Sequence, residues 1–229
     1  MIASGRLGIL GGTFDPVHFG HLDAADAARH ALSLEQVWLI PSFDPPHRPA
    51  DPRASGFHRF ALVALAVQGN DALRASDLEL TRTGPSYTAD TLRALAHEGW
   101  HPSQLFFILG TDAFAEIATW REFPAVLDAA NFVVVARPGT TLDTAATRTP
   151  ALRGRMRRAG RETSGAAGTS VFLVEAHTRD VSSSTIRARL AARQPIDDLV
   201  PEAVARHIVA HHLYEAVDDL HGQNSAISK

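Results

Sequence analysis

Short runs of apolar residues alternate with segments of helical periodicity along most of the chain. The apolar runs predict buried strands at residues 6–10, 36–40, 105–109, 132–136 and 171–174, with a weaker extended segment at 72–80. A first helix is expected where Leu22, Ala25, Ala28, Ala31 and Leu32 form one apolar side, and further helices at 57–67, 89–97, 184–193 and 201–214. This alternation predicts an α/β fold, Rossmann-like and doubly wound, with a mainly parallel sheet and helices on both faces.

Three segments lack such periodicity. Residues 41–56 carry five prolines and predict a long loop after the second strand. Residues 139–169 are rich in Thr, Ala, Gly and Arg, so we expect a long surface loop with a short basic helix at 153–161. The polar residues 217–229 are expected to form a frayed tail. With no internal repeat, the 229 residues predict a single domain.

Composition narrows the possible partners. The net charge of -3 and pI near 6.4 disfavour a nucleic-acid partner. No apolar run reaches the ~20 residues of a membrane span, so we expect a cytoplasmic protein that does not bind membranes. Cysteine is absent and the one lysine is Lys229, which excludes thiol chemistry and a lysyl intermediate within the fold. Neither a monomer nor a homodimer is favoured.

The segment after the first strand carries the main candidate chemistry. Gly11, Gly12, Thr13 and Phe14 are followed by His18 and His21, where an amphipathic helix begins. Backbone N–H groups of a glycine turn and of a helix N-terminus face the same space, and this arrangement favours a phosphate group. The two histidines would add side-chain donors.

The same segment can be compared with other phosphate and metal motifs. A Walker A loop and a G-x-G-x-x-G fingerprint are both absent. A zinc site is disfavoured, because no cysteine is present and no H-E-x-x-H pattern surrounds the histidines. A purely structural role, in which the histidines only cap the helix and pack against it, would also explain them.

In an open α/β sheet, ligands bind outside the carboxyl ends of the strands. The residues that follow each strand are therefore the candidates for a binding site. The Gly-Pro-Ser turn at 84–86 predicts a helix start capped by Ser86 or Thr88, with free N–H groups suited to a carboxylate. At 182–184, serines open another helix and form a second phosphate cradle, with Arg187 one turn later.

The string GGTFDPVHFGHL at 11–22 resembles the (T/H)xGH signature of the nucleotidylyltransferase superfamily, and in full that of bacterial nicotinate mononucleotide adenylyltransferases. Further stretches resemble motifs of the same family in the same order. They are PSFDPPHR at 41–48, with Arg48 where lysine is usual, ELTRTGPSYTADTL at 79–92, GTD at 110–112, RPG at 137–139 and VSSSTIR at 181–187, which has mild departures at Val181 and Ser184.

The resemblance implies a direct attack of the nicotinate mononucleotide 5′-phosphate on the α-phosphorus of ATP, without a covalent intermediate. It implies Mg²⁺ bound with ATP, and no metal site of the protein itself. The catalytic residues would be His18, His21 and Arg187. ATP would contact Gly11, Gly12, Thr13, Phe14, His18, His21, Gly110, Asp112, Ser182, Ser183, Ser184 and Arg187. The mononucleotide would contact His47, Arg48, Ser86, Tyr87, Thr88, Asp112, Trp120 and Arg137.

Two alternatives stay open on the sequence. Another transferase of the superfamily would use pantetheine phosphate or a CTP-linked alcohol. A regulator would bind the nucleotide without turnover. The sequence also leaves the strength of preference for nicotinate over nicotinamide undecided.

Overall fold

A parallel sheet forms the centre of the computed structural model, which describes residues 5–45, 52–136, 150–159 and 168–215. Its strand order is β3-β2-β1-β4-β5-β7-β6, and every strand pairing in these ranges is parallel. The strands are β1 (Leu7–Gly12), β2 (Gln36–Pro41), β3 (Leu73–Ala75), β4 (Leu105–Gly110), β5 (Asn131–Ala136), β6 (Met156–Arg158) and β7 (Val171–Glu175). The predicted doubly wound fold is therefore confirmed.

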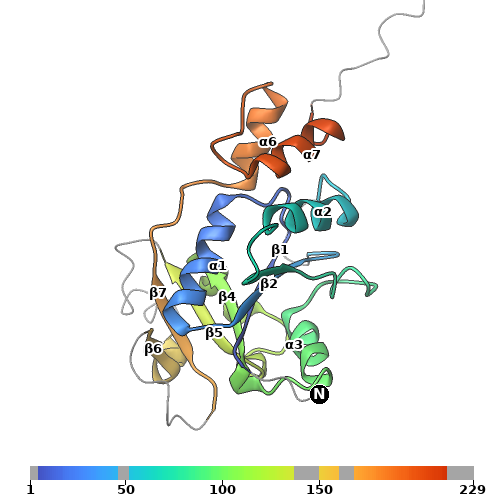
Figure 1. Ribbon diagram of the computed structural model, residues 1–229. Coiled ribbons are helices and arrows are strands. Elements are labelled where there is room, and N and C mark those ends of the chain that lie inside the picture. Colours follow the sequence, from blue (N-terminus) through green and yellow to red (C-terminus); the bar gives the residue numbers. More distant parts are fainter. Residues whose placement is uncertain (1–4, 46–51, 137–149, 160–167, 216–229) are drawn as a thin grey trace, which may run out of the picture.

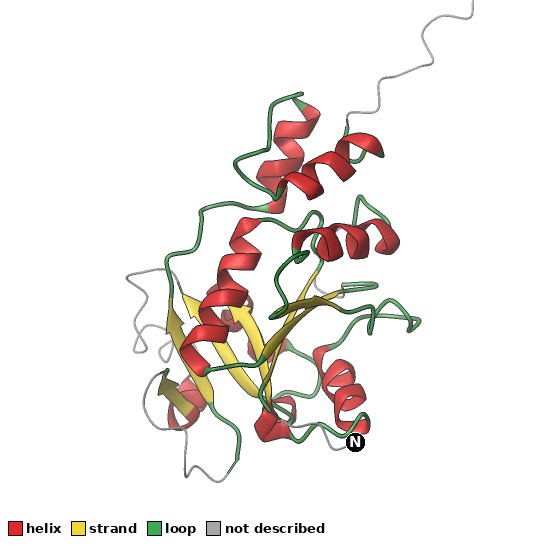
Figure 2. Ribbon diagram, viewed as in Figure 1, coloured by secondary structure: helices red, strands yellow, loops and turns green. Residues whose placement is uncertain are grey.

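Helices cover both faces of this sheet (Figures 1 and 2). One core cluster joins the sheet to α1 (Phe19–Leu32), α2 (Gly56–Ala66), α6 (Ser183–Ala191) and α7 (Glu202–Ala210). The other joins it to α3 (Thr88–His97), α4 (Thr111–Ala115) and 3-10 turns at Ile117–Thr119 and Ala125–Asp128. Figure 1 shows α6 and α7 beyond the end of the sheet at which β7 leaves it.

Alternate residues of each central strand belong to opposite cores. Phe106 and Ile108 of β4 face the α1 side, whereas Phe107 and Leu109 face the α3 side. Burial on both faces explains why these strands are continuous apolar runs in the sequence.

Several expected boundaries were wrong. The basic helix expected at 153–161 is a 3-10 helix, Pro150–Arg155, followed by the edge strand β6. Part of the surface loop expected at 139–169 is therefore regular structure, and Leu152 in it is buried. The strand expected at 72–80 is limited to β3, and α6 and α7 are shorter than expected. Arginine-rich composition hides the β6 signal because an edge strand needs few apolar residues.

The strand order reverses between β1 and β4, which are adjacent but far apart in the sequence. Such a switch point leaves a crevice beyond the carboxyl ends of the two strands. Gly11 and Gly12 end β1, and Gly110 ends β4. The candidate residues therefore gather at the place that the topology favours for a ligand.

Arg59, on α2, is only 1% exposed and holds three segments of this edge together. Its guanidinium donates to the carbonyl oxygens of Thr13 at 2.8 Å, Ser42 at 2.7 Å and Ala54 at 3.2 Å. Thr13 follows β1, Ser42 follows β2 and Ala54 precedes α2. A planar fork of N–H donors suits three separate acceptors, which a shorter cation would not reach together.

We expect Arg59→Met to lower the free energy of unfolding by about 3 kcal/mol, because it leaves buried carbonyl groups without a donor. Urea unfolding followed by circular dichroism measures this change. Arg206→Met, which removes an exposed arginine from α7, is the matched control. Equal stability of the two variants would show that the buried guanidinium does not hold these segments.

Candidate functional site

The loop between β1 and α1 is built around a buried carboxylate. Asp15 is 2% exposed and accepts hydrogen bonds from the backbone N–H groups of Arg53 at 2.9 Å and Ala54 at 3.1 Å. Phe14, with φ of 51°, and Thr13 are also buried, so they would meet a ligand through backbone groups. Gly11 and Gly12 are half-buried. The loop is therefore held in place by contacts with the protein interior.

His18 and His21 are stacked, with ring centroids 3.7 Å apart and planes at 25°. The rings of His21 and Phe14 form a T-shaped pair, with centroids 4.9 Å apart and planes at 73°. Nδ1 of His21 accepts the backbone N–H of His18 at 3.2 Å. In the neutral ring, the proton must then lie on Nε2 of His21, which makes that atom a donor for a ligand.

The His18 imidazole is 6% exposed, and its Nδ1 has no hydrogen-bond partner among the described residues. Burial lowers the pKa of His18 from 6.5 to about 4, although the charge of Asp23 opposes this shift. At pH 7 the ring is therefore neutral. His18 can donate a hydrogen bond to a ligand or accept one from it, but it supplies no positive charge.

The helix start at Ser182–Ser184, which the sequence predicts as a second phosphate cradle, lies directly against this loop. Ser182 caps α6 by accepting the N–H of Thr185 at 3.1 Å, and Ser184 Oγ lies 2.8 Å from Ser182 Oγ. Ser183 donates to the carbonyl oxygen of Pro16 at 2.8 Å. Segments about 167 positions apart thus form one surface.

Arg187 completes this junction. Its Nη1 donates to the Asp15 carbonyl oxygen at 2.7 Å and lies 3.8 Å from Asp15 Oδ2. The half-buried guanidinium is therefore positioned beside the β1–α1 loop. Since His18 is neutral, Arg187 brings a full positive charge to this junction that the His18 ring does not supply.

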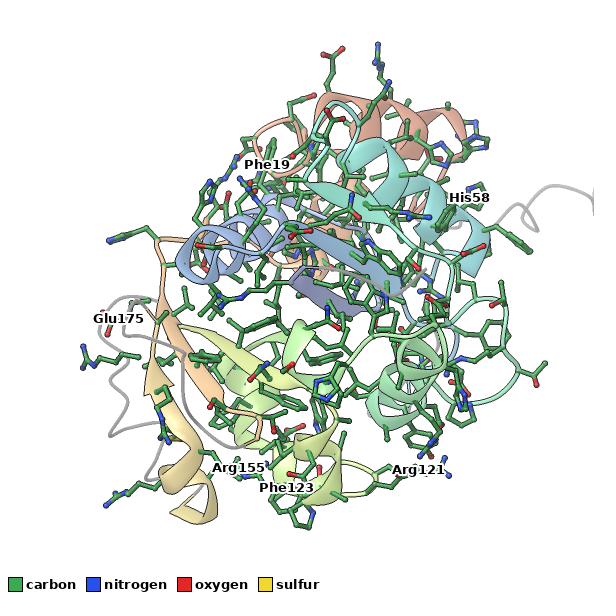
Figure 3. The ribbon with its side chains drawn as sticks, turned by 60° about the horizontal axis from the view of Figure 1, so that its bottom comes forward. Phe19, His58, Arg121, Phe123, Arg155 and Glu175 are labelled. Carbon is green, nitrogen blue, oxygen red and sulfur yellow. The ribbon has the colours of Figure 1, made fainter. Side chains whose placement is uncertain are left out.

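Gly20 allows the two motifs to meet. A Cβ at Gly20 would lie 3.2 Å from the Arg179 carbonyl oxygen, 3.2 Å from His18 Nδ1 and 3.2 Å from Val181 Cγ1. Arg179 is held there by a 2.9 Å ion pair with Asp23, and its guanidinium lies over the ring of Phe19, which Figure 3 labels. These partners, like Asp15 and Arg59, were missed in the sequence because they act through contacts between distant segments.

At the other side of the strand ends, two loops are joined through Ser86. Its Oγ accepts the N–H of Phe43 at 2.9 Å, and its own N–H donates to the Asp44 carbonyl oxygen at 2.7 Å. The expectation that Ser86 or Thr88 caps α3 is wrong: the N-cap is Tyr87, without a side-chain hydrogen bond. The first N–H groups of α3 still lack partners within the helix, so they suit an anion.

Further residues that the sequence predicts to contact a ligand lie at the end of β4 or after it in the chain. Gly110 and Asp112 are exposed, and no described atom lies within 4 Å of a Cβ at Gly110. Trp120 is half-buried, with its ring packed edge-on against Phe107 at a centroid distance of 5.9 Å and 86°. It therefore packs on the core and also keeps an accessible part. His47, Arg48 and Arg137 lie outside the described residues.

Within the described ranges, no group of three or more His, Asp or Glu side chains is arranged to hold a metal ion. The same ranges hold no helix of the length and apolarity that a bilayer crossing requires. The arrangement has two helix N-termini, a stacked histidine pair and Arg187 at one junction, and a third helix N-terminus near an aromatic ring. It can hold two anionic groups in fixed positions.

Comparisons with known proteins indicate the family of this chain. The profile of a family described as cytidylyltransferase-like matches residues 9–189. A protein of Symbiobacterium thermophilum named "Probable nicotinate-nucleotide adenylyltransferase" is 41% identical over 91% of this chain and 95% of its own length. One of Roseiflexus, with the same name, is 40% identical over 93% of this chain and 100% of its own.

A solved structure shows the same fold at low sequence identity. The nicotinic acid mononucleotide adenylyltransferase of Plasmodium falciparum, complexed with NaAD, aligns with a TM-score of 0.66 and 16% identity. The alignment covers 92% of this chain and 98% of the other.

The low pKa of His18 predicts a pH dependence of stability. In the unfolded chain His18 takes up a proton near pH 6.5, whereas in the folded chain it does so only near pH 4. The free energy of unfolding therefore falls as the pH drops below 6.5. Between pH 7 and pH 5 this amounts to about 2 kcal/mol. Urea unfolding at both pH values should show a smaller decrease for His18→Gln, and an unchanged decrease for His177→Gln, which alters an exposed ring. Identical decreases in all three proteins would contradict the burial effect.

Proposed function

This chain belongs to the cytidylyltransferase-like family, and within it to the nicotinate-nucleotide adenylyltransferases, and we propose that it transfers the adenylyl group of ATP to nicotinate mononucleotide. The products are nicotinate adenine dinucleotide and pyrophosphate, in NAD biosynthesis. The observation that carries this proposal is the junction of the two phosphate cradles, in which Arg187 contacts Asp15 and Ser183 contacts Pro16.

In the proposed reaction, a 5′-phosphate oxygen of the mononucleotide attacks the α-phosphorus of ATP. The bond from this phosphorus to the bridging oxygen breaks, and pyrophosphate leaves with the electron pair. The attacking group is already an anion, so the protein needs no nucleophile or general base. Its task is to align the two phosphates and to stabilise charge on the transferred and leaving oxygens.

Each phosphate-binding group has a distinct part in this proposal. The Nε2–H of His21 and the guanidinium of Arg187 donate to ATP phosphate oxygens, and the N-termini of α1 and α6 add positive potential. Neutral His18 contributes a hydrogen bond and supports the His21 ring. Mg²⁺ arrives with ATP as part of the substrate, held by phosphate oxygens and water.

The mononucleotide is proposed to lie toward β4 and α3. There, Trp120 would stack on the pyridine ring, and the free N–H groups at the start of α3 would receive its carboxylate. Asp112 would accept from a ribose hydroxyl. His47, Arg48 and Arg137 remain proposed contacts for the mononucleotide phosphate.

Purified protein with ATP and Mg²⁺ should release pyrophosphate when nicotinate mononucleotide is the acceptor, and much less with pantetheine phosphate. His21→Ala should lower kcat by about 10²- to 10³-fold, the usual effect of removing one donor to developing charge. His177→Ala, an exposed substitution, should keep the wild-type rate. Nucleotide binding without release of pyrophosphate would overturn the transferase assignment.

We expect Trp120→Leu to raise KM for nicotinate mononucleotide about tenfold, because one stacking contact with a base is worth a few kcal/mol at most. KM for ATP should change little. Trp100→Leu is the matched control, since Trp100 packs in the same core but against Trp38. Equal increases in both KM values would show that Trp120 only supports the fold.

A further inference from the structure

Arg121 follows the tryptophan of the proposed ring site and lies over a residue of the proposed carboxylate site. Its guanidinium carbon is 4.7 Å from the centroid of the Tyr87 ring, and Tyr87 is the N-cap of α3. Figure 3 shows Arg121 beside α3. A charged side chain therefore links the two elements that would surround the pyridine ring.

The first turn of α3 carries a charge of the wrong sign for an acidic ligand. Asp90 lies there, and a carboxylate near this helix N-terminus opposes the binding of another anion. Glu122 adds a second negative charge to the same surface. Two arginines offset them: Arg93 pairs with Glu122 at 2.9 Å, and Arg121 lies 3.4 Å from Asp90.

The two arginines differ in how firmly they are held. Arg93 donates from both terminal nitrogens, to Asp90 and to both oxygens of Glu122. Arg121 has longer ion pairs, at 3.4 Å to Asp90 and 3.8 Å to Glu122, and its side chain is 51% exposed. Stacking on Tyr87 leaves the edge of the Arg121 guanidinium able to donate to a further acceptor.

The two candidate rings differ by one charge at this position. Nicotinate mononucleotide carries a ring carboxylate, and nicotinamide mononucleotide carries a neutral amide. A cation beside the ring substituent therefore favours the acid, and its removal leaves Asp90 and Glu122 against Arg93 alone.

We propose that Arg121 is a specificity-determining residue, which makes the site prefer the acidic mononucleotide over its amide. This inference depends on the proposed function. The N–H groups of α3 distinguish the acid from the amide only in part, because an amide oxygen can accept hydrogen bonds from the same groups. The Arg121 side chain would supply the rest of this selectivity.

The test compares kcat/KM for the two mononucleotides, with pyrophosphate release as the readout and ATP at saturation. In Arg121→Gln, the ratio of kcat/KM for the acid to kcat/KM for the amide should fall about tenfold, because the reaction with the acid becomes slower. This tenfold change corresponds to about 1.4 kcal/mol. Arg121→Lys keeps the charge and should keep most of the ratio. Arg93→Gln removes a cation of the same network that does not contact Tyr87, and it should change the ratio much less.

Three outcomes would overturn the inference. Arg121→Gln could lower both reactions equally, which would mean that it only positions Trp120 or Tyr87. It could leave the ratio unchanged, or Arg93→Gln could lower the ratio as much. If the wild-type protein releases pyrophosphate with neither mononucleotide, the proposed function itself fails, and that result differs from a change in ratio. Thermal unfolding of each variant confirms that the fold is retained.

Discussion

The buried guanidinium of Arg59 is the constraint on which the candidate site depends. It holds the carbonyl groups that follow β1 and β2 and the one that precedes α2, so these segments keep one relative position. Asp15 is the opposite charge in the same region, and it accepts the N–H groups of Arg53 and Ala54. Buried charges are tolerated only where hydrogen bonds satisfy them, so these loops have little freedom to move apart.

This rigidity explains the electrostatics of the junction. Tight packing removes water from His18, and the resulting fall of its pKa makes the ring a neutral hydrogen-bonding group. Positive potential comes instead from Arg187 and from the N-termini of α1 and α6. Fixed donors of this kind need no reorganisation when charge develops on a phosphate, which is their advantage over flexible cations.

The sequence was sufficient for the central fold because its buried strands are continuous apolar runs, such as residues 105–109 and 132–136. Local motifs also predicted that His18, His21 and Ser182 stand at helix starts, and the structure places them there, since these positions depend on a turn and a helix start. The sequence did not reveal Arg59, Asp15 as a partner of Arg187, or Arg121 over Tyr87. Each of these depends on contacts between distant segments, and an arginine at a buried position carries the same letter as one on the surface. The edge strand β6 was missed for a related reason, because a run of arginines is also typical of the solvent-exposed face of a helix.

The distance between the two phosphate cradles along the chain has a consequence for how the site forms. Ser183 and Pro16 are 167 positions apart, and Arg179 and Asp23 are 156 apart, yet each pair is in direct contact. These pairs meet because β7 leads the chain back from the far side of the sheet to α6 beside the β1–α1 loop. A Cβ at Gly20 would lie 3.2 Å from atoms of both segments, closer than ordinary van der Waals contact. The junction is therefore a product of the tertiary fold, which brings the start of α6 and the β1–α1 loop, two segments distant in the sequence, into direct contact.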